Sequence, residues 1–210
     1  MEHCKLYQSH VLFPENQNLV IEGPVPPEQL SQLDFHPGLH AFRRPAEQHE
    51  ALIEIAALPE GRIIITRDRN QIVGYVTFHY PDEQERWSEG QMEDLIELGA
   101  IEVAAEYRSL GLGQQMIRTA FEQGQMERYI VFTTEYYWHW DLKGSGLNVW
   151  EYRKMMERLM KVVDMEWYAT DDPEICSHPA NCLMVRIGSR VPLASQEQFD
   201  RLRFRQRFMY

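Results

Sequence analysis

Residues 95–124 constrain the fold of this chain more than any other segment, because three signals follow one another there in a fixed order. Leu95–Val103 reads as a strand, glycines fall in the turn after it, and Gly111–Gly124 has apolar residues at helical spacing. A strand that passes through a turn into a helix places unpaired N–H groups and the positive end of the helix dipole at that turn. The segment therefore predicts an α/β fold with a place for an anion where the helix starts.

The turn itself, Arg108–Gln114, has the chemistry to bind a phosphate through its backbone N–H groups. Gly111 and Gly113 lack a Cβ, so a pyrophosphate can approach the chain closely. The same glycines can also serve the conformation of the turn alone, and that alternative stays open. The turn lacks the Gly-Lys-Ser/Thr ending of a Walker loop and the Gly-x-Gly-x-x-Gly of dinucleotide-binding turns.

The rest of the chain alternates expected strands and helices. Strands are expected at Leu6–Phe13, Leu19–Glu22, Arg62–Arg67, Gln71–Tyr80, Tyr129–Thr134, Glu166–Thr170 and Asn181–Ile187. Helices are expected at Pro27–Leu33, at Pro45–Leu58, from Asn148 as N-cap to about Val163, and from a capping box of Ser195 and Gln198 onward. Pro81–Met92 is polar and reads as a surface excursion. One α/β domain over residues 1–210 is predicted, with a C-terminal helix at about 195–208.

Charge and composition exclude several classes of protein. The formal net charge is −11, which disfavours nucleic acid and anionic membranes as partners and tolerates a cationic substrate. No apolar run approaches the ~20 residues of a membrane helix, and the N-terminus lacks the apolar region of a signal peptide, so we expect a cytoplasmic protein. Cys176 and Cys182 flank His178, but this spacing is not a known ligand pattern, so no metal is expected.

The turn also resembles a known motif. Arg108-Ser109-Leu110-Gly111-Leu112-Gly113 resembles the acyl-CoA motif of the GNAT superfamily, Arg/Gln-x-x-Gly-x-Gly/Ala, although Ala104–Glu106 stands where that family usually has a proline. The resemblance implies the acyl-CoA N-acyltransferase fold, with a central, mostly antiparallel sheet flanked by helices, and acetyl-CoA as co-substrate. The CoA-binding residues that it implies are Ile101, Val103, Arg108, Ser109, Leu110, Gly111, Leu112, Gly113, Gln114 and Asn148.

Longer blocks of the chain are similar to one branch of that superfamily, the acetoin-utilisation acetyltransferases of bacilli. These blocks are 44–52, 85–90, 92–103, 133–144 and 177–184. The resemblance implies a protein-lysine N-acetyltransferase that inactivates acetyl-CoA synthetase in acetoin and acetate metabolism. Two alternatives stay open: an acetyltransferase for small amines, and a non-catalytic acyl-CoA sensor that inhibits a partner by contact.

Acetyl transfer to lysine needs a base, because at pH 7 only about one lysine in 2,500 is neutral. Glu97 precedes Arg108 at the spacing at which the histone-acetylating branch of the superfamily has its catalytic glutamate. Apolar neighbours are expected to raise the pKa of this carboxyl, which suits a base. The alternative is a solvated glutamate at the start of a strand.

For four further features of the sequence, more than one role stays open. Tyr152 follows the Gly144–Gly146 loop, where many relatives place the acid that protonates the CoA thiolate, but it also begins an apolar helical stripe. Asn148 contacts the pantetheine arm or caps the helix. The aromatic run Tyr136–Trp140 fills the core, shapes a lysine entrance or forms a protein interface. Glu102 is a second acid or a structural partner.

Overall fold

The computed structural model describes residues 1–12 and 18–205, which form two compact units that each combine distant stretches of the chain. The N-terminal unit comprises Glu2–His79 and Leu98–Gln125. The C-terminal unit comprises Met1, Tyr80–Glu97 and Met126–Tyr210. The prediction of one domain over the whole chain stays a prediction.

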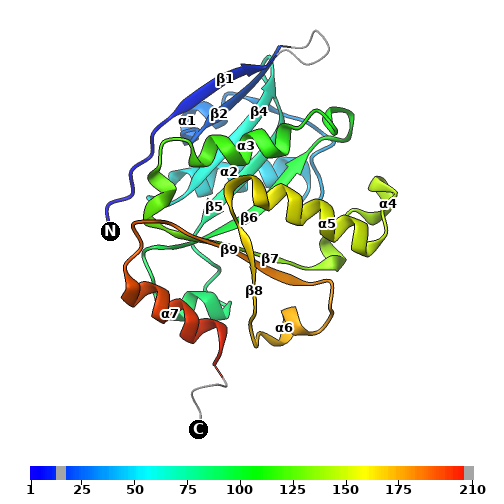
Figure 1. Ribbon diagram of the computed structural model, residues 1–210. Helices are drawn as coiled ribbons and strands as arrows, with labels where there is room; N and C mark the ends of the chain where they lie inside the picture. Colours follow the sequence, from blue (N-terminus) through cyan, green and yellow to red (C-terminus); the bar gives the residue numbers. More distant parts are fainter. Residues whose placement is uncertain (13–17, 206–210) are drawn as a thin grey trace. The chain divides into compact units, whose positions relative to one another are not determined.

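The N-terminal unit is an antiparallel sheet in the strand order β1-β2-β4-β5-β6 (Figure 1). Its strands are β1 (Gln8–Leu12), β2 (Leu19–Gly23), β4 (Arg62–Asp68), β5 (Gln71–His79) and the part of β6 (Leu95–Val103) that starts at Leu98. The short β3 (Asp34–Phe35) pairs in parallel with β5. These strands lie where the sequence predicted them, apart from β3, which the sequence did not indicate.

Helices cover both faces of this sheet. Leu52 and Ala56 of α2 (Pro45–Ala57) share a core with Tyr75 of β5, beside the short α1 (Pro27–Leu30). On the other face, Phe121 of α3 (Leu112–Phe121) contacts Phe78 of β5 edge to face, with 6.1 Å between ring centroids. Because neighbouring residues of a strand point to opposite faces, α2 and α3 lie on opposite sides of the sheet, as Figure 1 shows.

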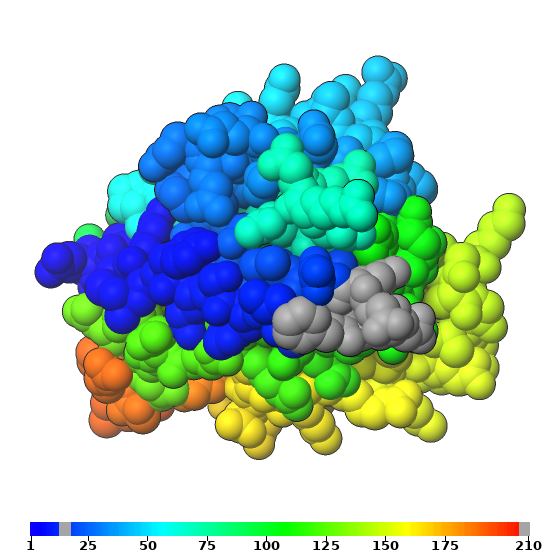
Figure 2. Space-filling view, turned by 90° about the horizontal axis from the view of Figure 1, so that it is seen from above, coloured from blue at the N-terminus to red at the C-terminus, as the bar shows by residue number. Residues whose placement is uncertain are grey.

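The N-terminal segment crosses the surface of this unit, where Figure 2 shows it in dark blue. Lys5 attaches this segment to the end of α2, because its Nζ donates to Ala56 O at 2.9 Å and to Leu58 O at 2.6 Å. These are carbonyls at the end of α2, which have no partner within the helix. The turn that the sequence predicted at Pro14–Asn18 lies almost wholly outside the described residues.

The C-terminal unit is a smaller sheet in the order β6-β7-β9-β8. Leu95–Glu97 of β6 pairs in parallel with β7 (Ile130–Glu135), while β9 (Cys182–Ile187) pairs antiparallel with β7 and with β8 (Glu166–Tyr168). Its helices are α4 (Leu142–Ser145), α5 (Val149–Met160), α6 (Pro173–Cys176) and α7 (Leu193–Arg203). None of the helices in the described part of the chain has the length and apolarity that crossing a bilayer requires.

Two expectations for this unit are wrong. Pro81–Met92 is not a plain surface excursion, because Trp87 in its 3-10 helix η2 (Arg86–Gly90) is only 2% exposed and packs against Phe132 and Phe199. The last helix does not start with a Ser195 capping box: it starts at Leu193 after Pro192, and Gln198 instead donates to Gly90 O at 2.7 Å. The distant partner of Gln198 outweighs the local pattern.

The predicted cap at Asn148 is confirmed. Its side-chain oxygen accepts from the N–H groups of Trp150 and Glu151 at 3.0 Å each. The Glu151 carboxylate accepts from the Asn148 N–H at 3.0 Å, which completes a capping box at the start of α5.

Glu102 has the structural role that the sequence left as one of two alternatives. Its side chain is buried, and one carboxylate oxygen accepts from the backbone N–H groups of His40 and Ala41 at 2.8 Å each. The other accepts from the Tyr75 hydroxyl at 2.7 Å. Glu102 therefore fastens the segment before α2 to the sheet of the N-terminal unit.

Replacing Glu102 with alanine is expected to lower the free energy of unfolding by about 2–4 kcal/mol, because three donors lose their acceptor. Tyr75→Phe is the matched control: it removes one donor and leaves both backbone bonds in place, so the loss is about 1 kcal/mol. Urea unfolding followed by circular dichroism measures both. Equal midpoints for Glu102→Ala and the unmodified protein contradict this role.

Candidate functional site

The anion-binding turn lies in the N-terminal unit, between Val103 and α3. Ser109 and Gly111 both adopt the left-handed conformation, with φ of 68° and 74°. For Ser109 this conformation costs about 1–2 kcal/mol, so the surrounding fold must impose it. When right-handed and left-handed backbone conformations alternate along a turn, successive N–H groups point toward one place and form a concave site that can bind an anion.

The first turn of α3 adds further donors. The first N–H that bonds within the helix is that of Gln115, which donates to Gly111 O at 3.1 Å. The N–H groups of Leu112, Gly113 and Gln114 precede it, so the helix supplies them no acceptor. A Cβ built on Gly111 meets no atom within 4 Å, so this side of the turn is open to a ligand.

Three contacts hold the turn in place within its unit. Arg108 Nε donates to Val103 O at 3.1 Å, and the Tyr107 hydroxyl donates to Asp68 at 3.0 Å. Glu106 pairs with His36 at 3.0 Å. The turn is therefore shaped before any ligand binds, which suits tight recognition of a pyrophosphate.

Glu97 lies in the C-terminal unit and is only 8% exposed. Burial is the main reason why its pKa rises to about 8, and the nearby carboxylates of Glu85 and Asp82 raise it further. A hydrogen bond with the Thr134 side chain acts in the opposite direction. Glu97 is therefore not a solvated glutamate, and it has the pKa of a group that exchanges protons near neutral pH.

Further acidic groups lie in the same unit, and Glu85 connects them with Glu97. Burial raises the pKa of Glu85, and so do Asp82, Glu174 and Asp172. One carboxylate oxygen of Glu85 is buried and has no hydrogen-bond partner among the described residues. We call Asp82, Glu85, Glu97, Asp172 and Glu174 the acidic cluster. Such a concentration of carboxylates favours a cation in their vicinity.

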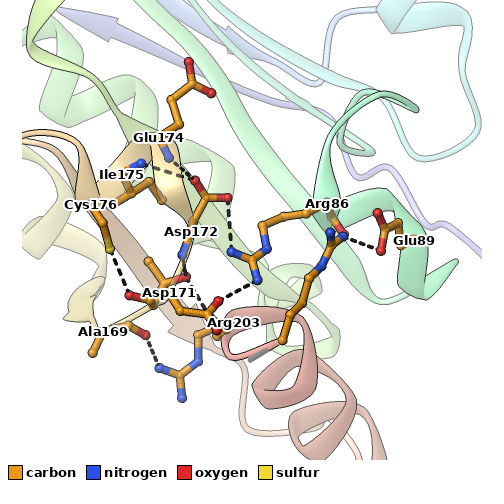
Figure 3. Close-up of polar contacts among 11 residues, drawn as sticks. Arg86, Glu89, Ala169, Asp171, Asp172, Glu174, Ile175, Cys176 and Arg203 are labelled. Carbon is orange, nitrogen blue, oxygen red and sulfur yellow. Dashed lines mark hydrogen bonds and ion pairs between the residues drawn. The ribbon is translucent and has the colours of Figure 1, made fainter. Parts of the chain in front are cut away.

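Figure 3 shows how Arg86 organises one side of this cluster. Its side chain is 7% exposed and pairs with Asp171 at 2.7 Å and with Asp172 at 3.4 Å. Asp172 also accepts from the N–H groups of Glu174 and Ile175, at 2.9 and 3.2 Å, which caps α6. One guanidinium thus faces two carboxylates.

Tyr152 also lies in the C-terminal unit, half-buried on α5. Its ring stacks on Trp140, with 5.1 Å between centroids and 17° between planes. Trp140 Nε1 donates to Glu135 at 3.0 Å, and burial raises the pKa of Glu135 to about 7. Glu135 and Trp140 therefore fix the position of the Tyr152 ring.

The residues singled out from the sequence thus fall into two groups. Ile101, Val103 and the turn Arg108–Gln114 belong to the N-terminal unit, whereas Glu97, Asn148 and Tyr152 belong to the C-terminal unit. Sequence reasoning missed Glu85, Thr134 and Glu135 as parts of the surroundings of Glu97 and Tyr152. The available signal was Glu135 itself, a carboxylate at the end of the strand β7.

Residues 1–12 and 18–205 contain no group of three or more His, Cys, Asp or Glu side chains arranged to hold a metal ion. Cys182 is buried, and burial with the nearby Glu135 raises the pKa of its thiol to about 12.

Glu97→Gln is expected to raise the melting temperature more at pH 9 than at pH 5. The folded-state pKa of Glu97 is about 8, above the ordinary value of 4.5, so its contribution to stability falls as the pH rises between these values. At pH 5 Glu97 is already neutral in the folded protein, and glutamine resembles it. Differential scanning calorimetry at both pH values makes the comparison.

The matched control is Glu54→Gln, because Glu54 is exposed on α2 and loses little solvation on folding. Its effect on the melting temperature is expected to be small at both pH values. An effect of Glu97→Gln that is the same at pH 5 and pH 9 contradicts a raised pKa.

Comparison with known proteins places the chain in a family. The model of the acetyltransferase (GNAT) family matches residues 29–137. The acetoin utilization proteins AcuA of Bacillus subtilis and Bacillus licheniformis are 61% and 60% identical to the chain, over 100% of both chains in each case. The crystal structure of an acetoin utilization protein from Exiguobacterium sibiricum is 55% identical, covers 98% of each chain and gives a TM-score of 0.95.

These matches confirm the fold and the enzyme class that the resemblance implied. The strained, open turn before α3 fits the pyrophosphate of acetyl-CoA, because it offers backbone N–H groups and no Cβ at Gly111. The chain therefore belongs to the GNAT family of acetyltransferases and is an enzyme that takes its acetyl group from acetyl-CoA.

Proposed function

We propose that this enzyme transfers the acetyl group of acetyl-CoA to a lysine of acetyl-CoA synthetase in the cytoplasm, and that the modification inactivates the synthetase. The observation that carries the proposal is the buried carboxyl of Glu97 inside the acidic cluster. The names of the two Bacillus relatives, which refer to acetoin utilization, support a place in acetoin and acetate metabolism.

The acidic cluster suits a cationic acceptor in two ways. Its negative charge attracts the ammonium group of a lysine. Deprotonating that group at pH 7 costs about 4–5 kcal/mol, because the pKa of a free lysine is ~10.4. A carboxylate whose pKa is raised to about 8 is a stronger base than an ordinary glutamate, so the fraction of Glu97 that is ionised at pH 7 takes the proton at a lower cost.

We assign the steps of the reaction as follows. Glu97 accepts a proton from the ammonium group, directly or through a water molecule. The neutral lysine nitrogen then bonds to the thioester carbonyl carbon, and the carbon–sulfur bond breaks. The Tyr152 hydroxyl gives its proton to the departing CoA thiolate, and the second proton, which the nitrogen loses as the amide forms, restores that hydroxyl. The stack on Trp140 would hold the Tyr152 ring in the orientation that this transfer requires.

The proposed CoA contacts come mainly from the strained turn. The N–H groups of residues 109–114 hold the pyrophosphate, and Arg108 lies beside them. Ile101 and Val103 of β6 contact the pantetheine arm. Asn148 is proposed to contact it through its side-chain NH₂ group, since its side-chain oxygen serves the helix cap.

Catalysis fits these observations better than a non-catalytic sensor. Binding of acetyl-CoA alone requires the turn before α3 but no base, and the burial of the Glu97 carboxyl lowers stability above pH 4.5. A carboxyl kept in such a place is typical of an active site.

The test is the intact mass of purified acetyl-CoA synthetase after incubation with the enzyme and acetyl-CoA. A single acetyl adduct, with loss of synthetase activity, is expected. Glu97→Gln is expected to slow adduct formation by about 10²–10⁴-fold while acetyl-CoA binding, measured by calorimetry, is unchanged.

Glu54→Gln again serves as the control and is expected to acetylate at the normal rate. If the enzyme binds acetyl-CoA and leaves the synthetase unmodified, the proposed client is wrong. If Glu97→Gln acetylates at the normal rate, the proposed base is wrong.

A further inference from the structure

Two aromatic side chains directly after β7 form an unusual pair. The rings of Tyr136 and Trp138 stack with 4.9 Å between centroids and 15° between planes. Tyr136 is half-buried against the core of the C-terminal unit, which accounts for its place in the fold. Trp138 is 44% exposed, so core packing does not account for it.

The pair is joined to Glu97 through one hydroxyl group. The Thr134 side chain hydrogen-bonds Glu97 and also hydrogen-bonds the Tyr136 hydroxyl. A threonine hydroxyl can take part in more than one hydrogen bond, so Thr134 can bridge these two side chains. The stack thus extends from the surroundings of the buried carboxyl to the exposed Trp138, within one unit.

Three carboxylates act on Tyr136 of this pair. Burial raises the pKa of Tyr136, and the carboxylates of Glu174, Asp172 and Glu85 raise it further, which indicates a negative potential at its ring. Aromatic faces themselves attract cations, and they also contact apolar methylene groups well. An apolar stem that ends in a cation matches both properties of this surface.

We propose that the stacked rings of Tyr136 and Trp138 are the wall along which the side chain of the acceptor lysine reaches Glu97, so that this pair selects amines on a long aliphatic stem. The inference rests on the proposed function of Glu97 and deepens it by assigning the acceptor path to named residues. The methylene groups of the lysine lie against the rings, and its ammonium group approaches the acidic cluster. Trp138, as the exposed member, contacts the lysine first.

The test compares Trp138→Ala, Trp138→Phe and Trp167→Ala. Trp167 on β8 is 57% exposed and serves as the control for loss of a surface tryptophan. The acceptors are purified acetyl-CoA synthetase and Nα-acetyl-lysine methylamide, and release of the CoA thiol gives kcat and KM for each.

For Trp138→Ala, the KM for both acceptors is expected to rise about tenfold, with kcat and the KM for acetyl-CoA unchanged. Trp138→Phe keeps an aromatic face, so its acceptor KM is expected to stay within about threefold of normal. Trp167→Ala is expected to behave as the unmodified enzyme. A higher KM for the acceptors with an unchanged KM for acetyl-CoA indicates a role in acceptor binding, whereas a general loss of structure would affect both.

Two outcomes overturn this inference alone. One is a normal acceptor KM in Trp138→Ala while Glu97→Gln is inactive. The other is an equal loss of kcat and of acetyl-CoA affinity in Trp138→Ala, which indicates a structural role. Failure of the unmodified enzyme to acetylate either acceptor overturns the proposed lysine acceptor, and the inference falls with it.

Discussion

Removing the Glu97 carboxyl from water places the strongest demand on the C-terminal unit. Leu95 and Ile96, which precede Glu97 in β6, are buried, and β7 pairs with this part of the strand. Thr134 supplies a hydrogen bond, while Glu85 and Asp82 add negative charge. The unit therefore keeps a proton on Glu97 over a pH range in which an exposed glutamate has lost it. The same arrangement that lowers stability at high pH gives the group its basicity.

The packing of the C-terminal unit maintains this environment. Trp87 packs against Phe132 and Phe199. This packing positions η2, which contains Arg86 and directly follows Glu85. Arg86 then holds Asp171 and Asp172. In the N-terminal unit the comparable cost is the left-handed backbone at Ser109, which turns backbone N–H groups toward one point. Each unit thus loses some stability at one residue, Glu97 in the C-terminal unit and Ser109 in the N-terminal unit.

Sequence patterns predicted the parts of this structure that depend on local interactions. The structure contains the strand, turn and helix predicted in residues 95–124. Their signals, the spacing of apolar residues and the position of glycines, act between residues that are close in sequence. The Asn148 cap is local in the same sense. The burial of Trp87 and the hydrogen bond of Gln198 to Gly90 O were not predictable, since both depend on contacts between η2 and α7, far apart in sequence. The surroundings of Glu97 were not predictable for the same reason. Glu85 and Thr134 come from two separate segments, and Glu174, which acts on Glu85, comes from a third.

The central claim is that Glu97 is a carboxyl with a strongly raised pKa, and nuclear magnetic resonance tests it without reference to any substrate. The enzyme is labelled with carbon-13 at the side-chain carboxyl of glutamate, and the Glu97 signal is identified by its absence in Glu97→Gln. Its chemical shift is then followed from pH 4 to pH 10. The structure gives a midpoint of about 8, whereas a midpoint near the ordinary 4.5 would contradict the account of Glu97 as the base.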